Sequence, residues 1–249
     1  MTFFYNSTPL NLNIAPLSFR SKPVATPPQI LPRQDGFTSN PLYENFGTKY
    51  QIEAIAKANP RIVQIMQEHN LPIKANLEEL NKLKEGHLKE TRIIAAKTYS
   101  ALPQELKQEV SLTNLQEAAM FHDYGKVLIP DKILNKEGKL NESEREIMEL
   151  HSELGYELLK DKGFDDKTLK LLKYHHQNPQ LTGYPAVGND FEYGIDLQIL
   201  NASDKYSALT EKRSYKDAMS KEQALQIIKE DVEKGLLSPE VYQALEKAV

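Results

Sequence analysis

The chain has 249 residues, a net charge of −4, a hydrophobic fraction of 40% and no cysteine. This composition allows one globular domain with an appendage, and it excludes disulfides, thiolate catalysis and cysteine-ligated zinc. The acidic balance provides no positive field for polymeric nucleic acid, and no apolar run is long enough to predict a membrane span. We therefore expect a cytoplasmic protein in which nitrogen and oxygen atoms supply the ligands of any metal.

The first part of the chain is rich in proline, with seven of the fourteen prolines before residue 42. Because proline interrupts helices and the surrounding polar residues bury little apolar surface, residues 1–45 are expected to form an extended or disordered tail. Helical spacing begins at Ile52, Ile55 and Ala56. It predicts a helical N-terminal extension over residues 46–85, with two helices that cap the core and are too short for a sensor domain.

Residues 86–249 are expected to form the main domain. One helix is predicted from about residue 76, through His87, to residue 101, and another ends at His122. Further helices are predicted at 142–160, 165–177, 195–210, 220–234 and 238–248. No sustained alternating pattern competes with them, so the fold class is predicted to be all-α, a helical bundle.

Histidine and aspartate residues recur in these helical segments. Five of the six histidines and two aspartates form a series of possible ligands: His87, His122, Asp123, His151, His175, His176 and Asp204. Neighbouring helical residues point about 100° apart, so the pair His122-Asp123 can face one site only near a helix end. Gly125 supplies such an end.

Two neutral imidazoles with a shared carboxylate suit divalent Mn, Fe or Zn, and a bridging aspartate can hold two ions about 3.5–4 Å apart. That arrangement suits phosphoester hydrolysis. Each histidine alone is more commonly structural, and His69 is interpreted in that way. The order and pairing of the other five favour a site with two metals.

Three segments resemble the HD-GYP branch of the HD phosphohydrolase superfamily, a branch associated with cyclic dinucleotide phosphodiesterases. They are FHDYGKVLIPDKILNKEGKLNESEREIMELHSELG, YHHQNPQLTGYP and ILNASDKYSALTEKRSYKDAMS. The resemblance extends from about Gly86 to the C-terminus and implies an HD-type helical bundle.

The resemblance also implies roles for the ligand series. One metal would be held by His87, His122 and Asp204, and the other by His151, His175 and His176. Asp123 would bridge the two ions and take part in catalysis. Lys126 would be catalytic and contact a substrate phosphate, where a positive charge would stabilise the transition state. The family favours Fe or Mn over Zn for the two divalent ions.

Two further groups are implied on the substrate side. The triplet Gly183-Tyr184-Pro185 matches the GYP motif, a loop beside the active site that is linked to protein partners. The residues Arg213, Tyr215 and Lys216 match a basic turn that faces the substrate. By themselves, the first group is an ordinary turn and the second an ordinary solvated helix cap.

Several positions depart from the family pattern. Uncharged residues replace acidic residues or glycine in the GYP loop, a serine replaces an acidic residue near Asp204, another replaces proline in the basic turn, and the glutamate of a third metal site is absent. These positions are Gln177, Gln180, Leu181, Ser207, Ser214 and Leu83. Two metals are therefore expected in place of three.

The expected function is hydrolysis of a cyclic dinucleotide such as cyclic di-GMP by a metal-bridging hydroxide. Two alternatives remain open. One is an HD phosphohydrolase that acts on another nucleotide or phosphoester, and the other is a catalytically weak module that binds a cyclic dinucleotide or docks a protein partner. The complete ligand series favours an enzyme.

Overall fold

The computed structural model describes residues 48–211 and 218–249 of the chain. In these residues every regular element is a helix, and the only β-type contact is an isolated antiparallel bridge between His176 and Tyr184. The predicted all-α fold is therefore confirmed. The tail predicted for residues 1–45 lies outside the described residues. Among those described, no helix combines the length and apolar character needed to cross a membrane.

Three helices precede residue 86: α2 (Lys49–Ala58) and α3 (Pro60–Glu68), and then α4 (Leu77–Glu85), which covers the first part of the helix predicted from residue 76. The side chain of Asn59 caps α3 by accepting from the backbone amides of Arg61 and Ile62. Pro60 occupies the first helical position, where its missing N–H has no cost. The Asn59-Pro60 pair therefore ends one helix and begins the next.

The helix predicted from residue 76 to residue 101 is divided in two, so its predicted continuity is wrong. After α4, Gly86 leaves the helical conformation with φ −104° and ψ −103°, and α5 (His87–Ala101) begins at the next residue. A Cβ atom at Gly86 would lie 3.1 Å from Glu211 Oε1 and 3.2 Å from the Lys82 carbonyl oxygen. The break places His87 in the first turn of α5.

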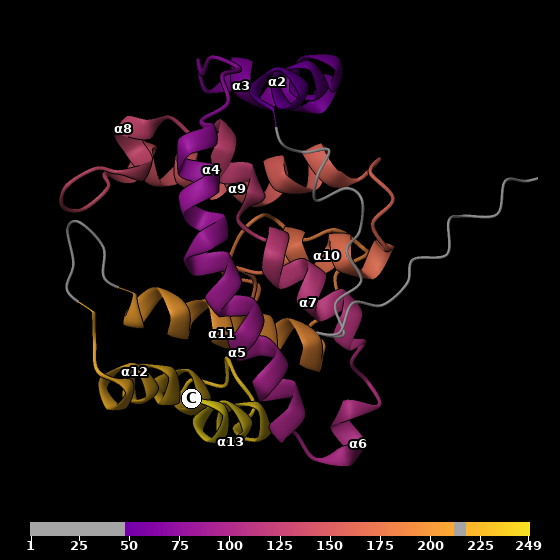
Figure 1. Ribbon diagram of the computed structural model, residues 1–249, viewed down its shortest axis with the longest axis vertical. Coiled ribbons are helices and arrows are strands. Elements are labelled where there is room, and N and C mark those ends of the chain that lie inside the picture. Colours follow the sequence, from indigo (N-terminus) through magenta and orange to yellow (C-terminus); the bar gives the residue numbers. More distant parts are fainter. Residues whose placement is uncertain (1–47, 212–217) are drawn as a thin grey trace, which may run out of the picture. The chain divides into compact units, whose positions relative to one another are not determined.

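The other helices follow the predicted order (Figure 1). They are α6 (Gln104–Lys107), α7 (Leu112–Phe121), the 3-10 helix η1 (Tyr124–Leu128), α8 (Asp131–Leu134), α9 (Glu142–Leu159), α10 (Asp166–Tyr174), α11 (Ile195–Thr210), α12 (Lys221–Glu233) and α13 (Pro239–Ala248). Capping boxes begin α9 and α12. The short elements α6, η1 and α8 were not predicted, because none completes two turns of apolar spacing.

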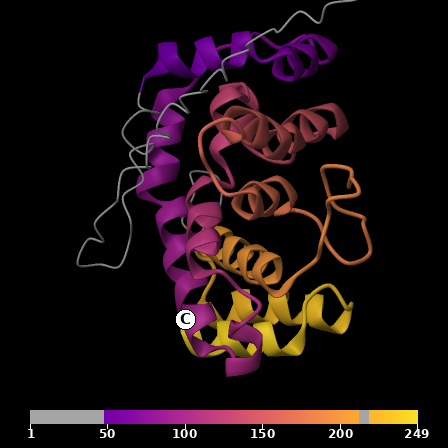
Figure 2. The ribbon, with the colours of Figure 1, turned by 90° about the vertical axis from the view of Figure 1, so that its right-hand side faces the viewer.

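Two apolar cores organise the described residues. One joins α5, α7, α11, α12 and α13, and the other joins α2, α3, η1 and α9. Figure 2 shows α12 and α13 at one end and α2 and α3 at the opposite end. Helices α7 and α10 contribute to both cores. Their C-terminal ends therefore lie deep between the cores, where His122 and His175 are buried.

Candidate metal centre

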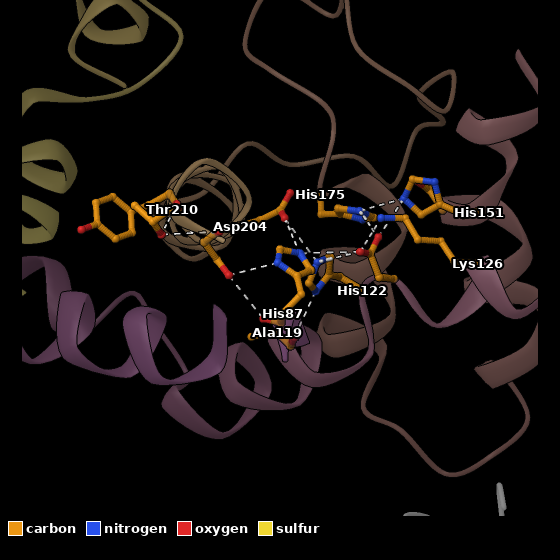
Figure 3. A network of polar contacts seen from close by, with 12 residues as sticks. His87, Ala119, His122, Lys126, His151, His175, Asp204 and Thr210 are labelled. Atoms are coloured by element: carbon orange, nitrogen blue, oxygen red, sulfur yellow. Dashed lines mark hydrogen bonds and ion pairs between the residues drawn. The ribbon is translucent and has the colours of Figure 1, made fainter. Parts of the chain in front are cut away.

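Five helices deliver the predicted ligand side chains to one place. His87 comes from the start of α5, His122 and His175 follow α7 and α10, and α9 and α11 contribute His151 and Asp204. Figure 3 shows these side chains gathered between the helices. The ring centroids of His175 lie 4.9 Å from His122, 5.2 Å from His151 and 4.0 Å from His176.

The pair His122-Asp123 faces one site because α7 ends there. His122 is the C-cap of α7, and Asp123, with φ −92° and ψ 7°, is the N-cap of η1. The helix therefore ends before Gly125, whose role is different. A Cβ atom at Gly125 would overlap the carbonyl oxygen of His151, so this glycine lets the backbone of η1 contact α9 directly.

Three imidazoles are oriented by the backbone of their own helices. The Nδ1 atoms of His122, His151 and His175 lie 3.0, 2.6 and 2.6 Å from the carbonyl oxygens three residues earlier. A carbonyl can only accept, so each Nδ1 carries the proton and each Nε2 presents a lone pair to the centre. Backbone support of this kind fixes the tautomer of metal-binding histidines.

His87 is supported by a side chain from α11. Its Nδ1 lies 3.0 Å from Ser207 Oγ, and its Nε2 lies 2.9 Å from Asp204 Oδ1. Ser207 stands where the family pattern has an acidic residue, and the sequence assigned it no role. Its hydroxyl is buried and holds the first histidine in place.

The carboxylate of Asp123 lies between two groups of histidines. Its Oδ1 is 3.2 Å from His151 Nε2 and 3.9 Å from His175 Nε2. Its Oδ2 is 3.6 Å from His87 Nε2 and 3.7 Å from His122 Nε2. Together with His176, these residues form two possible metal-binding groups that share Asp123.

The surroundings of His122 Nε2 show whether the residues of the centre suit a metal ion. This atom is fully buried and makes no hydrogen bond, although Asp204 Oδ1 is 3.5 Å away. A buried polar atom without a partner costs free energy, and a neutral imidazole nitrogen among carboxylate oxygens is a good ligand for a divalent transition metal. The clustered histidines and aspartates therefore form a divalent-metal-binding site.

Burial and charge set the protonation of the centre. Burial lowers the pKa of His151 to about 3 and that of His176 to about 4, and it lowers the pKa of His175 well below its ordinary value. Burial alone would raise the pKa of Asp123, but the Lys126 ammonium and nearby imidazoles outweigh it and hold that pKa well below its usual range. Neutral imidazoles and an ionised carboxylate are the forms that bind metals.

These pKa shifts predict that the metal-free protein loses stability as the pH falls. His151 and His176 have folded-state pKa values below the ordinary 6.5, so the unfolded chain binds more protons below that pH. The free energy of unfolding should fall between pH 6.5 and pH 4, by about 2 kcal/mol at pH 5 for His151 alone. Urea unfolding of chelator-treated protein at pH 7.5 and 5 measures the loss.

The raised pKa of His122 does not cancel this loss. Burial would lower that pKa, but Asp123 and Asp204 outweigh burial and raise it. Its contribution is complete below pH 6.5 and is lost at higher pH, so between pH 7.5 and pH 5 it offsets part of the loss, but one imidazole does not offset the combined loss from His151 and His176. The loss of unfolding free energy between pH 7.5 and pH 5 should be smaller in His151→Gln, whereas it should stay the same in His69→Gln. Equal unfolding free energies at pH 7.5 and 5 in the unsubstituted chain would contradict the prediction.

A cavity of about 410 Å³ opens onto the centre. Its lining includes Asp123, Lys126, His151, His176, Tyr184 and Asp204. Lys126 Nζ lies 2.6 Å from Asp123 Oδ2, so the cavity holds an ammonium group directly beside the shared carboxylate. Glu79, Lys82 and Met148 also line the cavity, and no sequence motif had singled them out.

The GYP triplet lies against the second histidine group. The Tyr184 ring is 4.5 Å from the ring of His176 and 6.0 Å from that of His151, measured between centroids. A Cβ atom at Gly183 would overlap the His176 carbonyl oxygen, so glycine is required for this approach. The predicted basic turn at Arg213, Tyr215 and Lys216 lies outside the described residues.

The fold and the site define a helical, metal-binding domain, and comparison with known proteins identifies its class. The model of the HD domain family matches residues 73–241, and the chain belongs to this family. With its His-Asp pair and GYP triplet, it is a member of the HD-GYP branch, as its curated relatives indicate.

Two curated relatives illustrate the match. A cyclic di-GMP phosphodiesterase from Thermotoga maritima is 36% identical over 141 residues, which cover 56% of this chain and 38% of that protein. A 3'3'-cGAMP-specific phosphodiesterase from Vibrio cholerae is 32% identical over 135 residues, covering 54% of this chain and 29% of that protein. The chain thus spans about a third of the length of these relatives.

One solved structure supports the fold. An HDG"Y"P protein from Bdellovibrio bacteriovorus superposes with a TM-score of 0.51 at 16% sequence identity, covering 83% of this chain and 66% of that chain. At this identity the likeness concerns the fold alone, and the predicted HD-type bundle agrees with it.

Proposed function

We propose that this chain is a metal-dependent phosphodiesterase that hydrolyses a cyclic dinucleotide of the cyclic di-GMP type. The observation that carries the proposal is the position of Asp123, whose two carboxylate oxygens face separate histidine groups at the base of one cavity. The activities named for the curated relatives support the same reaction and substrate class.

The proposed centre holds two divalent ions, Fe or Mn in preference to Zn. His87, His122 and Asp204 would hold one ion, His151, His175 and His176 the other, and Asp123 would serve both. Bound ions of this kind lower the pKa of water and polarise phosphoryl oxygens. Because the pKa of Asp123 is held low, its carboxylate is better suited to act as a metal ligand than as a proton acceptor.

The substrate side of the proposal rests on the cavity. The Lys126 ammonium lies at its base and would offset the charge of the phosphodiester under attack. Tyr184 forms part of the cavity wall, and its neighbours Gly183 and Pro185 belong to the same loop. During hydrolysis, the oxygen of water bonds to phosphorus, one P–O ester bond breaks, and the leaving oxygen takes a proton.

Other parts of the proposal come from the sequence. The basic turn at residues 213–216 is proposed to contact the dinucleotide, and the GYP loop is proposed to contact a protein partner. The division into a tail over 1–45, a helical extension over 46–85 and a phosphohydrolase domain over 86–249 stays a prediction, as does the cytoplasmic location.

One experiment tests the proposed function. The purified chain is loaded separately with Fe, Mn and Zn, its metal content is measured, and cyclic di-GMP and bis(p-nitrophenyl) phosphate are assayed with each metal. We expect about two ions per chain and turnover of cyclic di-GMP with Fe or Mn. Turnover of the generic ester alone would exclude the cyclic dinucleotide. Loaded protein that hydrolyses neither compound would favour a binding module.

Lys126→Met is expected to lower kcat/KM for the proposed substrate by about 100-fold, because one preorganised positive group beside the phosphoryl oxygens is lost. The metal content should stay unchanged, since Lys126 donates to Asp123 but does not belong to either ligand group. Steady-state kinetics and metal analysis measure the two effects. Lys132→Met, at an exposed position on α8, is the matched control. Loss of metal from Lys126→Met would instead assign this lysine a role in assembling the centre.

A further inference from the structure

The loop of residues 178–185 carries the GYP triplet and joins the metal centre at both of its ends. It leaves the body of the protein directly after Gln177 and returns at Pro185. Its tip, residues 179–182, is exposed. Asn178 organises this tip by accepting from the backbone amide of Gln180 at 2.9 Å and donating to Thr182 Oγ1 at 2.9 Å.

Gln177 closes the base of the loop. Its side chain is almost completely buried, with 2% relative exposure. The Nε2 group donates to the carbonyl oxygen of Pro185 at 2.6 Å, and Oε1 accepts from the backbone amide of Asn178. Because the carbonyl can only accept and the amide can only donate, the orientation of the side-chain amide is fixed.

A second contact holds the same side of the loop to α11. The Nδ2 group of Asn201 donates to the backbone carbonyl oxygen of Gln177 at 2.8 Å. Gln177 is therefore anchored to a helix that carries Asp204, and through Pro185 it anchors the residue that follows Tyr184.

The donor property of position 177 matters because the acceptor is a backbone carbonyl. An ionised carboxylate at this position could not donate, and it would place a buried negative charge beside the Pro185 oxygen. The family pattern has glutamate here, so this contact depends on the amide of the present chain. Gln180, at a second such position, also uses its amide as a donor, to the carbonyl oxygen of Lys234 at 2.9 Å.

We propose that Gln177 is a positioning residue, whose side-chain amide holds Tyr184 against His176 and thereby fixes one wall of the cavity over the metal centre. The inference rests on the proposed function for its kinetic consequence only. The proposal also has a structural consequence. When the donor at position 177 is removed, the base of the loop between residue 177 and Pro185 should open, while the helices that carry the ligands stay folded.

Hydrogen exchange in the full chain tests the structural consequence without any assay of activity. Gln177→Met keeps the side-chain length and removes the donor, and Gln67→Met, at an exposed position on α3, is the matched control. In Gln177→Met, peptides covering 177–187 should exchange at least about tenfold faster, and peptides from α9 and α11 should not change. Unchanged exchange in 177–187 would overturn the proposal.

Two further measurements keep the test decisive. If Gln177→Met loses its helical circular dichroism, Gln177→Leu replaces it and should give the same local loosening; protection equal to the parent would overturn the proposal. In the active enzyme, Gln177→Met should raise KM for the cyclic dinucleotide several-fold while kcat for bis(p-nitrophenyl) phosphate stays within about twofold. Faster exchange in a chain that hydrolyses neither compound would support the loop contact and reject the proposed function.

Discussion

Asp123→Ala is expected to abolish metal binding and phosphodiesterase activity together. The substitution removes the carboxylate that the two ligand groups share, and four imidazole Nε2 atoms lie within 3.9 Å of its oxygens. Activity should fall at least a thousandfold, which is more than the roughly 10- to 100-fold effect of losing an outer-shell partner. Metal analysis of the purified variant and assay with added Fe or Mn measure both losses.

The control for this prediction is Asp131→Ala, at an exposed position on α8, which should keep the metal content and activity. Circular dichroism must show that Asp123→Ala keeps its helices, because removal of a buried charge among buried imidazoles also changes stability. A folded Asp123→Ala variant that binds two ions and retains activity would contradict the shared-ligand role.

Gly125→Ala is expected to lower the free energy of unfolding by about 3 kcal/mol, at the upper end of the usual cost of overpacking. The added methyl group would overlap the His151 carbonyl oxygen and lie 2.5 Å from the Gly155 nitrogen. Backbone atoms of two packed elements cannot move away as a flexible side chain can. Urea unfolding at pH 7.5 measures the loss, and a displaced η1 should also weaken metal binding.

Gly138→Ala is the control that separates the cost of steric overlap from the cost of backbone conformation. Gly138 has φ +88°, but nothing lies within 4 Å of a Cβ atom placed there. Its replacement should cost only about 1 kcal/mol, which reflects the left-handed conformation. Equal losses for the two variants would show that the contact between η1 and α9 adapts to a methyl group.

The sequence predicted the ligand series because ligand chemistry depends on residue type and order, both of which are visible in the chain. His122-Asp123 and His175-His176 were recognisable as pairs, and the structure brings both pairs to one centre. The backbone carbonyls that orient the imidazoles were not predictable, because every residue has a carbonyl and only the fold selects which ones face a histidine.

The same limit applies to the break at Gly86 and the contact of Gln177. Apolar spacing continued across Gly86, and one of the two atoms that a Cβ atom there would approach belongs to Glu211, far away in sequence. Gln177 was noticed only as a departure from the family pattern. Its partner, Pro185, lies across a loop whose path local propensity does not determine.

The hydrogen bonds from Nδ1 of His122, His151 and His175 to helix carbonyls have a consequence for the uptake of ions. The lone pairs of His151 and His175, whose pKa values are lowered by burial, face inward before any ion arrives, so these two rings need little reorganisation during loading. His151 and His176 are also unprotonated at neutral pH, since their pKa values are about 3 and about 4. Occupancy of their side of the centre should therefore release almost no protons, and availability of ions, more than competition with protons, would govern it.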